Sequence, residues 1–373
     1  MRILGRLAAA LLVLFLAFVL WTSSWPRTPS IGAPNAIAEL QSVEIGDLEQ
    51  WVLIRGEDRA NPILFWLHGG PGAAQMPVHR AFNQDLEEDF VVVHWDQRGA
   101  GKSNHGGFSE DTMTMDRYVA DVREMTRYLK DRFDRDQILL LGHSWGTQIG
   151  MRAAHRYPED YSGFVSVGQV VHGERAGELS YEWLAEQVET HGTEDDRQAL
   201  EALGEPPFDE RERYVEFAQM KDRFGGGMDV GFRRLLWPAL RATEYSVLDY
   251  VRWLRGATRG SGPMWEEQGS ENIFGAVPAV EVPVWFIAGE NDYNTPTALV
   301  QEYYDMLEAP EKHLTILEGA AHAPFFDRPD RFHEEMKRVR DTFYKEGNDE
   351  SIRAGSGVRQ IKAHRFDGTH VLR

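Results

Sequence analysis

The sequence predicts an α/β fold in which a mostly parallel, eight-stranded sheet is flanked by helices and interrupted by one helical insertion. Short runs of bulky apolar residues, typical of buried strands, recur along the 373-residue chain. Amphipathic stretches alternate with several of these runs, and such alternation is typical of parallel sheets. We expect the eight strands at residues 43–45, 51–54, 63–67, 90–95, 138–141, 164–167, 283–289 and 313–317.

Three further features follow from the order and spacing of apolar residues. The first two expected strands are close in sequence and should form an antiparallel pair at the start of the sheet. Apolar residues recur at helical spacing from Tyr118 to Phe133, which predicts a helix before the strand at 138–141. A last helix is expected from about Phe325 to Lys345.

Composition divides the chain into segments. Residues 172–278 are charged, helical in pattern and rich in Trp and Tyr, with a break at the glycines 225–227. We expect this segment to form a helical cap inserted into a core made of residues 41–171 and 279–346. Residues 347–373 are polar and glycine-containing, and we expect them to form a flexible tail.

The most informative motif is Gly142-His143-Ser144-Trp145-Gly146, which lies between the buried strand at 138–141 and a helical stretch. In that context Gly-x-Ser-x-Gly forms a nucleophile elbow, a turn so sharp that side chains at its flanks would strike the neighbouring strand or helix. The serine is held in a strained backbone conformation that exposes its hydroxyl. The motif therefore predicts that Ser144 is a catalytic nucleophile.

A nucleophilic serine needs a histidine base and an acid that orients it, and in this type of site both follow the serine in the chain. Asp292 comes just after the expected strand 283–289, and His322 comes shortly after the strand 313–317. Both should therefore lie at the sheet edge where Ser144 emerges. Glu290 is the alternative acid, although we favour Asp292.

Backbone N–H groups near the serine could stabilise a developing oxyanion. His68-Gly69-Gly70-Pro71-Gly72 directly follows the strand 63–67, and glycines let the backbone approach such a charge closely. Pro71 has no N–H to donate. We therefore expect the amides of Gly70 and Trp145 to form the oxyanion hole.

Other motifs point away from nucleotide, metal and cofactor chemistry. Gly101-Lys102-Ser103 resembles the end of a phosphate-binding loop, but the glycine required five residues earlier is replaced by Asp96. We expect Asp96 and Arg98 instead to brace this loop by hydrogen bonding. The chain has no His-Glu-x-x-His motif and no clustered ligand spacing, so we expect no metal and no cofactor.

The charge balance argues against one class of binding partner, and the absence of cysteine excludes disulfide and thiol chemistry. A formal net charge of −19 disfavours nucleic acid as a partner. Without cysteine, neither a disulfide nor a thiol nucleophile is possible.

The amino terminus has the pattern of a membrane segment. Two arginines within residues 1–6 precede an uncharged apolar run from Leu7 to Trp21. We expect residues 1–21 to form a single-pass anchor that holds the catalytic domain outside the cytoplasm, and residues 22–40 to form a proline-containing linker. The alternative is a cleaved signal peptide and a secreted protein.

Taken together, these motifs resemble those of the α/β-hydrolases, and within them those of the proline iminopeptidase-like serine peptidases. The resemblance is based on the glycine run at 68–72, on residues 96–103, on the elbow at 142–146, and on the order and spacing of Asp292 and His322. It covers roughly residues 41–170 and 280–345.

This resemblance implies an aminopeptidase that releases an N-terminal residue, often proline, from short peptides and holds the free amine with acidic side chains of the cap. Glu174, Glu178 and Glu182 are candidates for that role. Two other functions remain open: a carboxylesterase or related hydrolase of small acyl substrates, and a ligand-binding protein with a vestigial triad.

Overall fold

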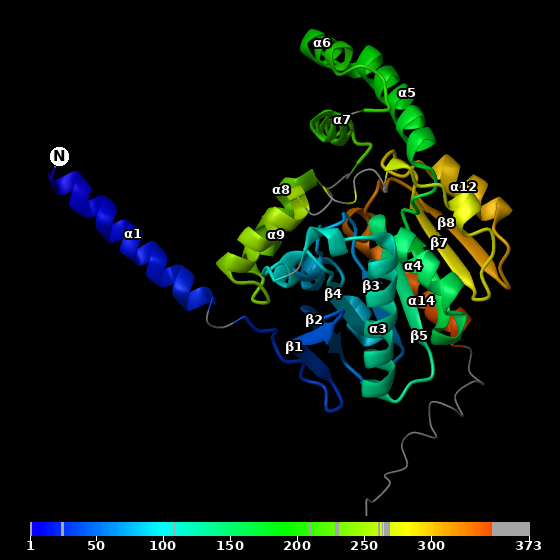
Figure 1. Cartoon of the computed structure of the whole chain (residues 1–373), viewed down its shortest axis with the longest axis horizontal. Helices are drawn as coiled ribbons and strands as arrows, with labels where there is room; N and C mark the ends of the chain where they lie inside the picture. Colours follow the sequence, from blue (N-terminus) through cyan, green and yellow to red (C-terminus); the bar gives the residue numbers. More distant parts are fainter. Residues whose placement is uncertain are drawn as a thin grey trace, which may run out of the picture.

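An eight-stranded sheet forms the centre of the molecule (Figure 1). The computed structural model describes residues 2–344 except 24–25, 108, 209, 228–230, 260–261, 263 and 265–268. The strand order is β1-β2-β4-β3-β5-β6-β7-β8. The strands are β1 (Ile37–Ile45), β2 (Leu48–Gly56), β3 (Ile63–Leu67), β4 (Val91–Asp96), β5 (Ile138–His143), β6 (Tyr161–Val167), β7 (Val284–Gly289) and β8 (Lys312–Leu317).

The pairing confirms the predicted α/β class. β1 pairs with β2 and β2 with β4 in antiparallel register, and the other five pairings are parallel. β3, β4, β5 and β7 are buried along their whole length, which explains why each is rich in bulky apolar residues in the sequence. β1 begins at Ile37, so the last four residues of the expected linker are strand.

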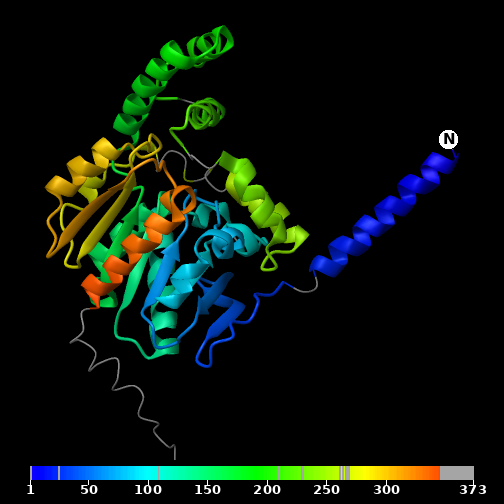
Figure 2. The same cartoon turned by 180° about the vertical axis from the view of Figure 1, so that it is seen from behind.

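Helices cover both faces of the sheet. α3 (Met115–Phe133), α4 (Trp145–Arg156) and α12 (Thr297–Met306) share a hydrophobic core on one face. α14 (Pro329–Phe343) packs on the other face, as the view from behind shows (Figure 2). The strands supply both cores by alternation, since Phe65 contributes to the first core and Trp66 to the second.

Apart from the long N-terminal helix α1, the remaining helices are short or lie in the segment between β6 and β7. The expected last helix is divided at Arg328, because Pro329 begins a new helix. The other helices are α1 (Arg2–Ser23), α2 (His79–Phe82), α5 (Gly173–His191), α6 (Glu194–Leu203), α7 (Arg211–Arg223), α8 (Gly231–Arg241), α9 (Val247–Arg259), α11 (Ile273–Ala276) and α13 (Pro324–Asp327). Short 3-10 helices span Met76–Val78, Gln84–Glu88, Gly101–Ser103, Glu110–Thr112 and Pro158–Asp160.

Helices α5 to α11 all belong to the segment expected to form the cap, and they rise beyond the carboxyl ends of the parallel strands (Figure 1). α5, α6 and α7 have a small core of their own, to which Leu184, Val188, Phe217 and Met220 contribute. α9 contacts the loop after β4, where the ammonium of Lys102 lies 2.8 Å from the Asp249 carboxylate. The expected tail over residues 347–373 lies outside the described residues.

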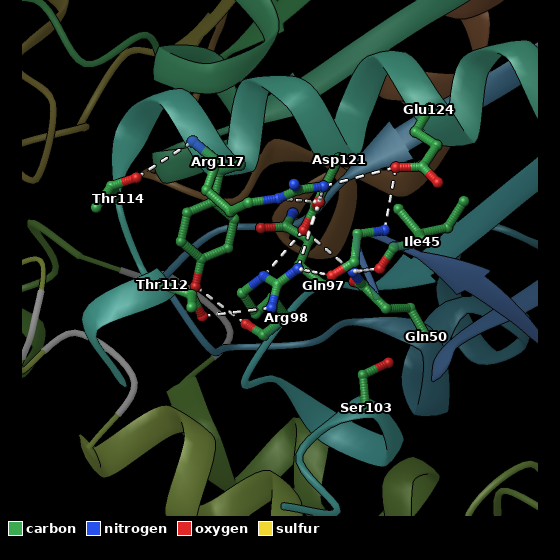
Figure 3. Close-up of polar contacts among 12 residues, drawn as sticks. Ile45, Gln50, Gln97, Arg98, Ser103, Thr112, Thr114, Arg117, Asp121 and Glu124 are labelled. Atoms are coloured by element: carbon green, nitrogen blue, oxygen red, sulfur yellow. Dashed lines mark hydrogen bonds and ion pairs between the residues drawn. The ribbon is translucent and has the colours of Figure 1, made fainter. Parts of the chain in front are cut away.

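A buried ion pair braces the loop after β4 against α3, as the sequence predicts for Arg98 (Figure 3). Arg98 Nε lies 3.0 Å from Oδ2 of Asp121, and both side chains are almost completely buried. Gln50 on β2 also donates to this carboxylate, and Arg117 contacts it from one turn earlier on α3. Asp96 accepts a hydrogen bond from the Lys102 amide and so fixes the same loop from within.

The expected membrane anchor is wrong. Across the part of the chain that the structure describes, no helix combines the length and the apolar character needed to cross a bilayer. α1 spans residues 2–23 and projects away from the sheet (Figures 1 and 2). Its uncharged run from Leu7 to Trp21 rises only about 22 Å at 1.5 Å per residue, less than the roughly 30 Å of a hydrocarbon core.

Candidate active site

Ser144 lies at a sharp turn between β5 and α4, and its φ of +52° is one of three positive values among the described non-glycine residues. Two glycines allow the turn. A Cβ at Gly142 would lie 2.4 Å from the Gly146 carbonyl oxygen, and a Cβ at Gly146 would lie 2.2 Å from the Leu67 carbonyl oxygen. No side chain fits at either flank, as the motif predicts.

Asp292 and His322 come together at the carboxyl end of the sheet. Nδ1 of His322 lies 2.9 Å from Oδ2 of Asp292, and Asp292 is only 1% exposed. Because the ring donates from Nδ1 to the carboxylate, Nε2 remains the atom that can accept a proton. Sequence reasoning missed Thr295, whose hydroxyl donates to the same carboxylate oxygen at 2.7 Å and lies 3.3 Å from His322 Nδ1.

The surroundings of Asp292 keep it ionised. Burial by itself raises the pKa of this carboxyl, but attraction to His322 and hydrogen bonds from His322 and Thr295 outweigh burial and leave the pKa below 3.8. Glu290, the alternative acid, is exposed and accepts from the Gly319 amide at 3.0 Å. The structure thus brings Asp292, and not Glu290, to the histidine.

The glycine-rich loop after β3 is fastened beside the elbow. His68 Nδ1 donates to the Gly69 carbonyl at 2.7 Å, and Nε2 accepts from the Gln97 amide at 3.2 Å. Burial lowers the pKa of His68 to about 4, so the ring is neutral near pH 7, as these roles require. Gln97 also bonds the His68 carbonyl and accepts from the Trp145 indole at 3.1 Å.

Gly70 and Trp145, the expected oxyanion donors, belong to the two segments that this network connects. Gly70 has a φ of +118° and lines the same pocket as Ser144. Trp145 is the first residue of α4, so its N–H has no carbonyl partner within the helix. Sequence reasoning missed His68 and Gln97, although a histidine at the start of a glycine run was a usable signal.

Two other histidines have packing roles. His143 accepts from the Gln75 amide at Nδ1, which leaves Nε2 to donate to the His322 carbonyl at 3.0 Å. Burial lowers its pKa to about 3, so it supports the loop of His322 as a neutral ring. His313 stacks on Trp285 with ring centroids 4.1 Å apart.

Ser144 and His322 open into a pocket of about 480 Å³ that lies between the sheet edge and helices α5 and α7. Glu174 lines this pocket and is exposed at its rim, whereas Glu178 and Glu182 are exposed and absent from the described lining. Lys221 also lines it and was not anticipated, although its spacing from Phe217 on α7 places it on the buried face of that helix. Most of the wall is uncharged: Val170, Val171, Pro206, Pro207, Phe208, Phe217 and Leu299.

The described residues contain no group of three or more His, Asp or Glu side chains arranged to hold a metal ion.

Comparison with known proteins gives this geometry a context. Residues 62–329 match the family described as the alpha/beta hydrolase fold. The chain is 30% identical over 307 residues to a probable aminopeptidase, YbaC, of Bacillus subtilis, covering 82% of this chain and 96% of the relative. A proline iminopeptidase of Arabidopsis thaliana is 34% identical over 113 residues, which are 30% of this chain and 28% of the relative.

A solved structure agrees at the level of the fold. The crystal structure of a proline iminopeptidase from Mycobacterium smegmatis superimposes with a TM-score of 0.59 at 21% identity, covering 85% of this chain and all of that one. The family match and the alignment with the Bacillus subtilis relative both cover most of the chain, and together they assign it to a family. The chain belongs to the alpha/beta hydrolase fold family and, within it, to the proline iminopeptidase-like group.

Proposed function

We propose that the protein is a serine hydrolase in which Ser144 attacks, His322 transfers protons and Asp292 orients the histidine. The observation that carries this proposal is the 2.9 Å contact between His322 and Asp292, beside a pocket that Ser144 and His322 both line. The positive φ of Ser144 adds support, because strain of this kind is characteristic of a nucleophile elbow.

The reaction proceeds through an acyl-enzyme. His322 Nε2 takes the hydroxyl proton as Ser144 Oγ attacks the substrate carbonyl carbon, and Asp292 stabilises the resulting imidazolium. The amides of Gly70 and Trp145 donate to the oxyanion. When the intermediate collapses, the bond to the leaving group breaks and His322 gives the proton to the departing amine. In the second half of the reaction, His322 takes a proton from water as the water attacks the acyl-enzyme ester. The ester bond then breaks, the carboxylic acid is released and Ser144 regains its proton from His322.

We infer that the substrate is a short peptide that loses its N-terminal residue. The long relative carries an aminopeptidase name, and the chain itself belongs to the proline iminopeptidase-like group. Glu174 supports this inference, since its carboxylate at the pocket rim suits a free amine. Residues 172–278 would then act as the cap, with α5 and α7 supplying pocket wall.

A carboxylesterase is the second candidate. The apolar wall formed by Val170, Val171, Phe208 and Leu299 also suits an acyl chain that carries no charge.

The test compares purified protein on prolyl-naphthylamide and on short nitrophenyl esters. We expect turnover of the arylamide, and we expect the Ser144→Ala variant to lose it. Ester turnover without arylamide turnover would reject the aminopeptidase in favour of the esterase. Full activity of Ser144→Ala on both substrates would reject the mechanism.

A further inference from the structure

We propose that Lys221 is a carboxylate-binding residue of the substrate pocket, and that the enzyme therefore prefers very short peptides with a free C-terminal carboxylate. This inference rests on the proposed function, because it adds the substrate class to the same site. It concerns a side chain that takes no part in the proton transfers described above.

Lys221 is a lysine at a core position. It lies in the last turn of α7, one turn after Phe217, and is only 2% exposed. Lysines are rarely buried to this extent unless a partner compensates the charge. Phe217, which also lines the pocket, lies under the ammonium at 4.7 Å.

The ammonium of Lys221 has a fixed position and makes no ion pair with a described carboxylate. Its Nζ donates to the Tyr293 carbonyl at 3.0 Å. Among the described residues no carboxylate lies within ion-pairing distance of it. One hydrogen bond leaves two N–H groups for a ligand that enters the pocket.

The electrostatic surroundings agree with this picture. Burial lowers the pKa of Lys221 to about 8, although the charges of Asp292 and Asp222 act to raise it. The group is thus still mostly protonated near pH 7, but its charge is poorly solvated. A carboxylate that binds there gains a stronger contact than a surface lysine would give.

Two backbone hydrogen bonds hold the loop that follows α7 against the loops that carry the proposed acid and base. The Tyr293 amide donates to the Gly226 carbonyl at 2.9 Å, and the His322 amide donates to the Gly227 carbonyl at 2.7 Å. A Cβ at Gly226 would lie 2.4 Å from the Trp183 ring, so the glycine is needed for this close approach. Lys221 is therefore positioned relative to the catalytic loops by backbone contacts.

The two charged side chains of opposite sign in the described pocket lining suit the two ends of a short peptide. Glu174 at the rim suits the amine, and the buried Lys221 suits the carboxylate. A longer peptide would place its carboxylate beyond the reach of Lys221 and bury an uncharged peptide unit there instead. Recognition of both ends would then limit the length of the substrate.

The experiment compares each of several dipeptides with its C-terminal amide. Hydrolysis of both is measured for the wild type, Lys221→Met, Lys221→Arg and the control Lys337→Met, which removes an exposed lysine of α14 outside the pocket. We expect the wild type and the control to favour the free acid by about tenfold in kcat/KM. Lys221→Met should bring the ratio near one, mainly through KM, and Lys221→Arg should retain most of it.

A second arm separates this proposal from the peptidase activity itself. Turnover of a nitrophenyl ester by the wild type is measured with the dipeptides and their amides as inhibitors. Stronger inhibition by the free acids, lost in Lys221→Met, supports the carboxylate site even if no peptide is cleaved. Equal inhibition by acid and amide in the wild type, or an unchanged preference in Lys221→Met, overturns it. Cleavage of neither peptide form, with ester turnover intact, overturns only the aminopeptidase function.

Discussion

Nδ1 of His322 lies 2.9 Å from Oδ2 of Asp292, although the two residues are 30 positions apart in the chain. β8 lies between them in sequence, and its parallel pairing with β7 returns the chain to the same edge of the sheet. The Asp292 carboxylate also accepts from the Thr295 hydroxyl and from the amides of Asn294 and Thr295. The carboxylate is therefore held in place independently of the histidine.

Replacing Asp292 by Asn should lower kcat/KM by about three to four orders of magnitude. The amide can donate a hydrogen bond to Nδ1, which stabilises the ring tautomer that carries its proton on Nε2, and that tautomer cannot accept from serine. Steady-state kinetics measure the loss, and Glu290→Gln is the matched control because Glu290 contacts the Gly319 amide instead. Equal losses in the two variants would contradict the assignment of the acid.

Gly146→Ala should destabilise the fold by about 2–4 kcal/mol or prevent soluble expression. The added Cβ would lie 2.2 Å from the Leu67 carbonyl oxygen and 3.0 Å from that of His68, so backbone must move. Gly275→Ala on α11 is the control, because nothing lies within 4 Å of a Cβ there. Thermal denaturation distinguishes them, and a wild-type midpoint for Gly146→Ala would show that the turn is looser than described.

Asp121→Asn should reduce the free energy of unfolding by about 3 kcal/mol. The change leaves the buried Arg98 guanidinium without its carboxylate, which is fully buried in the folded chain. Arg331→Ala, which removes one member of an exposed pair with Glu334, should cost less than about 0.5 kcal/mol. Urea denaturation of both variants gives the comparison, and similar small losses would mean that the brace after β4 adds little.

Asp96 should make the protein less stable as the pH rises from about 4 to 7. Burial raises the pKa of this carboxyl from 3.8 to about 7, despite hydrogen bonds from Tyr245 and the Lys102 amide. The stabilisation that protonated Asp96 gives the folded state is complete below about pH 4, where the folded and unfolded states both hold the proton. It declines as the pH rises toward 7, because only the folded state still holds the proton in that range. The slope from one proton is at most about 1.4 kcal/mol per pH unit.

Asp96→Asn should remove this slope. Free energies of unfolding measured at pH 5 and pH 7 for both proteins give the difference directly, since all other groups titrate in each. Parallel curves for wild type and variant would show that Asp96 is ionised in the fold.

The parts of the fold that the sequence predicts are those set by local chemistry. β3 matches the expected bounds because all five of its residues are apolar and buried. β1 extends further than expected because its central residues are only half-buried, and Glu39, Gln41 and Glu44 conceal the strand pattern. At the other end, Pro329 was a visible signal for the break between α13 and α14.

The parts that could not be predicted depend on contacts between distant segments. Ser144, Asp292 and His322 could be proposed because each follows a recognisable strand. Thr295 and Lys221 carry no motif, and their importance appears only when the loop after β7 meets α7. The expected anchor was wrong because the apolar composition of residues 7–21 outweighed their limited length.

The most direct test of the account is the covalent labelling of the nucleophile. The wild-type protein and the His322→Ala variant are treated with a fluorophosphonate, and the labelled peptide is located by mass spectrometry. We predict one adduct, on Ser144, whose rate of formation falls by at least about a hundredfold in the variant. An adduct on another residue, or an active wild-type enzyme that forms no adduct on Ser144, would contradict the central claim.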